Sequence, residues 1–164
     1  MNSTIDTDKI SQALTWIVTL LNDHQVPYQV VGGLAAQAYG ASRPLVDIDL
    51  YIAFDQAQLV LDAMKPYLTR APAPHRSAAW DLVYLAMEYQ DVQIEIGDSS
   101  TDARFYNRID QRWEAQVIDY TASQIVRLYG VDVAMMPKAE LLRYKRMLDR
   151  EVDHLDLQQI ADFV

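Results

Sequence analysis

Residues 30–52 read VVGGLAAQAYGASRPLVDIDLYI, and this stretch decides the fold that we expect. Two valines lead into Gly32 and Gly33, where a strand would end and a helix would begin. Glycine lets a ligand approach the backbone closely, and the start of a helix offers free N–H groups and a positive dipole end. The pair therefore indicates a phosphate-binding turn, although a glycine pair at such a place is often only structural.

Asp47 and Asp49 follow on the next expected strand, 46–53. Successive side chains of a strand point to opposite faces, so these two carboxylates project from one face with side-chain origins about 7 Å apart. Apolar residues on both sides indicate a central strand, where two bare carboxylates would be costly without a metal ion or another cation. The acid pair therefore predicts a divalent metal site.

A third acid, Glu95, lies among apolar residues in the expected strand 91–96. If this strand neighbours the first, the three carboxylates meet and hold two magnesium ions. Alternation equally allows Glu95 to face solvent while its neighbours face the core. Asp91, beside the preceding turn, is an alternative third ligand.

Helical and strand patterns alternate along the chain and predict an α/β (α+β) fold, a mixed β-sheet with flanking helices and a C-terminal helical pair. Helices are expected at 8–23, 34–39, 55–68, 137–148 and 152–163. Further strands are expected at 28–31, 82–89, 117–120, 125–128 and 131–135. Loops are expected at 71–74, which contains two prolines, and at 98–115. The last helix is expected to direct inward Leu155, Leu157, Ile160 and Phe163.

Composition narrows the class of protein further. The 164 residues include no cysteine, which excludes disulfides, thiolate metal sites and cysteine nucleophiles among them. We expect a single domain over 1–164, with 137–164 as its C-terminal helical extension. No signal peptide or membrane-length apolar run is visible, so we expect a cytoplasmic protein without a membrane partner. A net charge of −9 disfavours long nucleic acid but allows a metal-bridged nucleotide, and it favours a cationic acceptor.

A family resemblance appears once these motifs are combined. Gly32-Gly33, a short helix, Arg43, Asp47-Ile48-Asp49 and a later strand acid resemble the pattern of the DNA polymerase β-like nucleotidyltransferase superfamily. The glycine pair and the small size look like the lincosamide and aminoglycoside nucleotidyltransferases. The segment 141–157 is similar to the last helices of the lincosamide enzymes, so the resemblance covers about residues 10–160.

The resemblance implies an activity and a set of residue roles. The activity is metal-dependent transfer of a nucleoside monophosphate from a nucleoside triphosphate, such as ATP, to a hydroxyl acceptor that is small and antibiotic-like, as in antibiotic resistance. The implied roles are metal binding by Asp47, Asp49 and Glu95, catalysis by the same three acids with Glu95 as the base, phosphate binding by Gly32 and Gly33, and charge neutralisation by Arg43.

Several weaker expectations remain. Lys145, on the helix after Pro137, could reach the nucleotide, although most helical lysines are only solvated. Trp80 and other aromatic residues could stack on a base or acceptor, but core packing is more common. A homodimer with 137–163 contributing is plausible by analogy. Two other functions stay open, a toxin–antitoxin-type enzyme that modifies protein or tRNA and a non-catalytic nucleotide-binding relic.

Overall fold

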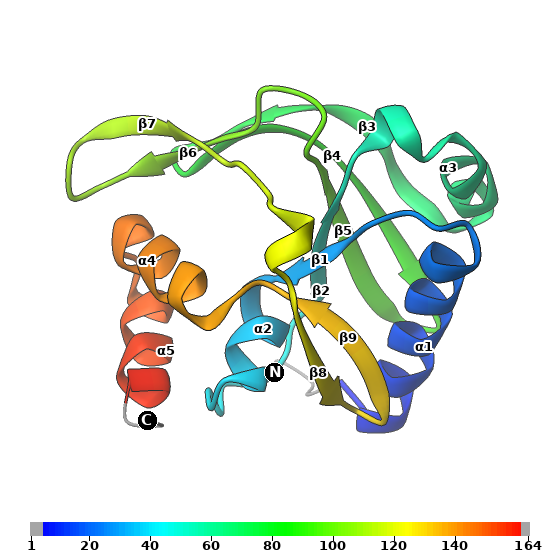
Figure 1. Ribbon diagram of the computed structural model, residues 1–164, viewed down its shortest axis with the longest axis horizontal. Helices are drawn as coiled ribbons and strands as arrows, with labels where there is room; N and C mark the ends of the chain where they lie inside the picture. Colours follow the sequence, from blue (N-terminus) through cyan, green and yellow to red (C-terminus); the bar gives the residue numbers. More distant parts are fainter. Residues whose placement is uncertain (1–4, 162–164) are drawn as a thin grey trace.

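The computed structural model describes residues 5–161, and in this part of the chain helices flank one mixed β-sheet of nine strands (Figure 1). The helices are α1 (Thr7–Asp23), α2 (Gly32–Ala38), α3 (Gln58–Met64), α4 (Lys138–Leu148) and α5 (Glu151–Ala161). The strands are β1 (Gln29–Val31), β2 (Ile48–Ile52), β3 (Leu68–Arg76), β4 (Trp80–Tyr89), β5 (Val92–Asp98), β6 (Arg104–Asn107), β7 (Arg112–Ala115), β8 (Gln124–Leu128) and β9 (Val131–Met135). The expected α/β (α+β) fold is confirmed.

The strands lie in the order β7-β6-β4-β5-β2-β1-β9-β8, and β3 pairs with β4 outside this path. Two neighbouring pairs, β2–β5 and β1–β9, are parallel, whereas the other pairs are antiparallel. The centre of the sheet is therefore β5-β2-β1, and the strand that carries the acid pair lies in the middle of it.

The hydrophobic core lies on one face of the central strands. Ile48 and Leu50 of β2 and Ile94 of β5 point to this face and are buried. The apolar stripe of α1 packs into the same core, where Leu14 and Leu21 are inaccessible to solvent. Each such side chain contributes roughly 1.5 to 3 kcal/mol by leaving water. The opposite face of β2 and β5 is thereby left to polar residues, which is where Asp49 and Glu95 lie.

The expected loop at 71–74 is wrong, because β3 runs through both of its prolines. Proline cannot donate a ladder hydrogen bond, but β3 pairs only with β4, so its other side needs no donors. The register also shifts between Arg70 and Ala73, as is common where proline enters a strand. An edge strand with irregular pairing thus tolerates a sequence that reads as a loop.

The expected long loop at 98–115 is also wrong, since it contains the β6–β7 hairpin. The buried side chain of Asn107 fixes the turn: its Oδ1 accepts hydrogen bonds from the backbone N–H of Ile109 and Asp110, both at 3.0 Å. The expected strand at 117–120 is wrong as well, because this segment leads into a 3₁₀ turn, Tyr120–Ala122. The expected strands at 125–128 and 131–135 do form a hairpin, β8–β9.

The β4–β5 connection is a tight turn in which Gln90 and Asp91 both have positive φ, +48° and +67°. A two-residue hairpin turn of type I′ requires positive φ at both positions. The Asp91 carboxylate pairs with Lys9 of α1 at 2.6 Å. This short turn fixes the register of β5 against β4, so that Ala86 lies opposite Glu95.

The C-terminal helical pair forms as expected, but α5 buries only part of the expected apolar set. Leu155 is 52% exposed, so its expected inward orientation is wrong, whereas Ile160 is buried and Leu157 half-buried. Phe163 lies outside the described residues. Two acids, Asp153 and Asp156, are buried instead. Within residues 5–161, no helix combines the length and apolarity that crossing a membrane requires.

Candidate active site

The glycine turn lies directly against the acid pair. β1 ends at Val31, and α2 begins at Gly32, whose φ of +66° is one that residues with a side chain rarely adopt. A Cβ atom at this position would lie only 2.6 Å from Oδ2 of Asp49. Gly32 is therefore required both by its backbone conformation and by the approach of the carboxylate, and the first turn of α2 lies beside that carboxylate.

The three expected acids come together. Asp49 of β2 lies in register with Glu95 of β5, and Asp47 directly precedes β2. One carboxylate oxygen from each residue lies within 4.8 Å of those from the other two. Glu95 therefore faces the same side as the aspartates, and Asp91 does not belong to the cluster because it pairs with Lys9 at the far end of β5.

Burial raises the pKa values of these three carboxyls, and neighbouring negative charge adds to the rise at Asp49 and Glu95. Burial raises the pKa of Asp49 well above its usual value, and the negative charges of Asp47 and Glu95 raise it further. Burial also raises the pKa of Glu95, to which the charge of Asp47 adds. The pKa of Asp47 is raised by burial, while a hydrogen bond with Asp49 and the charge of Arg43 oppose the rise. Such a cluster is unfavourable without a cation, and its oxygen donors are those that Mg²⁺ prefers.

A cavity of about 440 Å³ opens above the three acids. One wall carries the glycine turn and cationic side chains, namely Gly32, Gly33, Arg43, Lys145 and Arg150. The wall formed by β3 and β4 carries aromatic and apolar side chains, among them His75, Trp80, Leu82 and Tyr84. The cavity is thus lined by a carboxylate cluster, by cationic side chains and by aromatic and apolar side chains.

Comparison with known proteins decides the fold. No family model and no curated protein sequence matches the chain. A solved structure from Thermotoga maritima, provisionally assigned as a nucleotidyltransferase, superposes with a TM-score of 0.68 and 18% identity over 96% of both chains. The lincosamide antibiotic adenylyltransferase LnuA, bound to lincomycin, gives a TM-score of 0.62 and 15% identity over 93% of this chain and 97% of its own. The chain has the nucleotidyltransferase fold. ANT(2'')-Ia in complex with adenylyl-2''-tobramycin is similar too, with a TM-score of 0.56 and 12% identity over 93% of this chain and 87% of its own.

In this nucleotidyltransferase fold, all four residues expected to bind the nucleotide line the cavity. Gly32 and Gly33 open α2, with the guanidinium of Arg43 beside Gly33. Arg43 also forms an ion pair with Asp156 of α5, at 2.9 Å. The Lys145 side chain is only 3% exposed, and its ammonium lies between Asp153 and Asp156. Both cations thus already have protein partners.

Sequence reasoning did not find several residues of the site. Arg150, at the α4–α5 junction, lines the cavity, and so do His75 and Tyr84. Asp153 and Asp156 lie behind the cationic wall. The sequence did contain a signal for Asp153 and Asp156, because acids three positions apart on a helix share one face. Lys145, on the preceding helix, is the cation that pairs with both acids.

Proposed function

We propose that this protein is a metal-dependent nucleotidyltransferase that moves a nucleoside monophosphate from a nucleoside triphosphate to a hydroxyl group of a small acceptor. The observation that carries the proposal is the convergence of Asp47, Asp49 and Glu95, whose oxygens lie within 4.8 Å of one another. They converge beside a glycine-opened helix, which offers N–H groups to phosphate. The fold supports the same activity.

The chain's own residues supply a route for the reaction. The acceptor hydroxyl oxygen attacks the α-phosphorus, the bond from this phosphorus to its bridging oxygen breaks, and that electron pair leaves with pyrophosphate. Glu95 accepts the hydroxyl proton, because it is the most exposed of the three acids and its raised pKa suits a base. Asp47, Asp49 and Glu95 would hold two Mg²⁺ ions, which when bound would lower the pKa of the hydroxyl and neutralise phosphate charge.

The acceptor in this proposal binds on the β3–β4 wall. His75, Leu82 and Tyr84 line the cavity on the same sheet as Glu95 and offer a surface for an apolar or ring-shaped molecule. The similar structures of LnuA and ANT(2'')-Ia contain lincomycin and adenylyl-tobramycin, which supports an antibiotic-like acceptor. A homodimer that completes the acceptor pocket belongs to the same proposal, and light scattering would test it.

Pyrophosphate release tests the proposed function. The purified protein is incubated with Mg²⁺, each of the four nucleoside triphosphates, and lincosamide or aminoglycoside acceptors. We expect release that requires acceptor and Mg²⁺ and that is abolished in Asp49→Asn. The matched control is Asp55→Asn, which changes an exposed aspartate outside the cavity and keeps full activity. Binding of MgATP without transfer to any small molecule, protein or tRNA would instead identify a non-catalytic relic.

A further inference from the structure

Helix α5 buries two carboxylates on its inward face. The side chains of Asp153 and Asp156 have no exposed surface, and they lie three positions apart, on the same side of the helix. Burying an unpaired carboxylate is very costly, so such residues need partners. The two acids therefore act as fixed points to which cations from other parts of the chain are bound.

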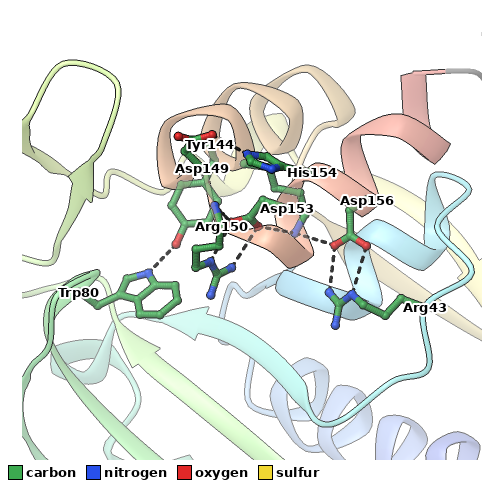
Figure 2. A network of polar contacts seen from close by, with 9 residues as sticks. Arg43, Trp80, Tyr144, Asp149, Arg150, Asp153, His154 and Asp156 are labelled. Carbon is green, nitrogen blue, oxygen red and sulfur yellow. Dashed lines mark hydrogen bonds and ion pairs between the residues drawn. The ribbon is translucent and has the colours of Figure 1, made fainter.

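Three cations from different segments meet at these acids (Figure 2). Asp156 accepts two hydrogen bonds from Arg43, at 2.9 and 3.2 Å, and pairs with Lys145 at 3.0 Å. Asp153 accepts hydrogen bonds from the side chain of Arg150, at 2.7 and 3.0 Å, and from Lys145 at 3.3 Å. Burial raises the pKa of Asp156, but these partners outweigh it and the pKa lies below its usual value. Three cations face these two acids, so this network carries one positive charge more than its own carboxylates, and the charge of Asp47 also acts on Arg43.

Arg150 is held from a second side by Trp80. Its guanidinium carbon lies 4.7 Å from the centre of the Trp80 ring, within cation–π range. Trp80 is fixed in turn, because its indole N–H donates to the hydroxyl of buried Tyr144 at 2.6 Å (Figure 2). A salt bridge and an aromatic face thus restrain one guanidinium, so Arg150 has a set orientation before any ligand binds.

Arg43 and Arg150 keep part of their hydrogen-bonding capacity for the cavity. Each uses Nε and Nη2 on its carboxylate, and among residues 5–161 no hydrogen bond involves Nη1 of either. Their side chains are 27% and 30% exposed, and both line the cavity above the three acids. Lys145 differs, because its ammonium is enclosed between the two carboxylates.

We propose that Asp153 and Asp156 are positioning residues that hold Arg43 and Arg150 as the two arms of one anion-binding wall for the terminal phosphates of the nucleoside triphosphate, with Lys145 as the internal cation that joins them. This inference rests on the proposed function. It adds Arg150 as a phosphate ligand and α5 as the element that assembles the wall. Planar guanidinium groups suit this role because they bind phosphate oxygens through paired hydrogen bonds.

The proposal predicts that inorganic pyrophosphate binds without metal, which calorimetry in EDTA at low salt measures. Asp156→Asn is the decisive variant, because it makes the wall more positive while releasing Arg43. If only net charge mattered, this variant would bind pyrophosphate more tightly. If Asp156 positions Arg43, as we propose, the variant binds pyrophosphate about tenfold more weakly. Equal or tighter binding by a variant with unchanged circular dichroism would overturn the proposal.

Arg150→Lys provides a second test that does not remove a buried group. It keeps the charge but loses the planar fork, so we expect pyrophosphate to bind about fivefold more weakly. The matched control is Arg146→Lys on the exposed side of α4, which should leave binding unchanged. Unaltered pyrophosphate binding by Arg150→Lys, or an equal loss of binding in Arg146→Lys, would contradict the proposed anion-binding wall.

Steady-state kinetics distinguish a role of Arg150 in binding phosphate from a role in the general stability of the fold. In the pyrophosphate-release assay, Arg150→Lys should raise the KM for the triphosphate and leave the KM for the acceptor unchanged, whereas general loosening of the fold would move both. Pyrophosphate binding in EDTA needs neither acceptor nor metal, so the two proposals fail separately. Arg150-dependent binding in a protein without transfer activity would support the wall and refute the proposed function.

Discussion

Gly32→Ala tests the link between the glycine turn and the acids. The new Cβ would lie 2.6 Å from Oδ2 of Asp49, whereas ordinary contacts begin at 3.4 Å. The carboxylate would have to move by close to 1 Å, and a misplacement of about that size costs roughly 100-fold in rate. The positive φ adds a cost of about 1 to 2 kcal/mol to folding.

Gly130→Ala is the matched control. Gly130 has a similar φ, +77°, but apart from its two chain neighbours no described residue lies within 4 Å of the Cβ it would carry. Urea unfolding should show a loss of about 1 to 2 kcal/mol for Gly130→Ala and a loss at least as large for Gly32→Ala, since both force alanine into the left-handed region and only the second also clashes with Asp49. Only Gly32→Ala should lose magnesium-dependent pyrophosphate release. If Gly32→Ala turned over as fast as Gly130→Ala, the contact between Gly32 and Asp49 would be irrelevant to activity.

Three further predictions concern charge and burial. The pKa of Asp49 is raised in the folded protein, so as pH rises from about 4 the unfolded state loses this proton first and the metal-free protein loses stability until the pH passes the raised pKa. Thermal melts in EDTA should show a smaller loss of stability in Asp49→Asn. Lys145→Met leaves two buried acids short of a cation and should cost about 3 kcal/mol in urea unfolding, whereas Lys9→Met, at an exposed pair, should change stability little. Tyr144→Phe removes the acceptor of the Trp80 N–H and should cost about 1 kcal/mol by the same measurement, with a changed tryptophan emission; an unaltered emission would contradict the hydrogen bond.

The centre of the site could be predicted from sequence because its pattern is local. Asp47 and Asp49 lie two positions apart, and strand alternation alone places them on one side. Glu95 was left open, because which strand lies beside β2 depends on distant pairing. The β4–β5 hairpin and the parallel β2–β5 register together place Glu95 opposite Asp49.

The errors have physical causes that local patterns do not contain. The β3 prolines are acceptable only because one side of that strand is unpaired. The β6–β7 turn has no glycine, and the buried amide of Asn107 organises it instead. In α5, polar residues are buried and Leu155 is exposed because cations from α4 and from the segment before β2 neutralise the acids. Such compensation is invisible to hydrophobic periodicity.

The tight turn at Gln90 and Asp91 has a consequence for how this protein can evolve. The two residues lie at the far end of β5, yet the turn they form helps to hold β5 in the register that places Glu95 opposite Ala86, and a slip of one residue in this pairing would turn Glu95 to the other face of the sheet. Asparagine and glycine should be accepted there, since they favour the same backbone shape. Residues that disfavour a positive φ should weaken this register from a distance, so backbone shape, more than side-chain chemistry, is the inherited constraint at this hairpin.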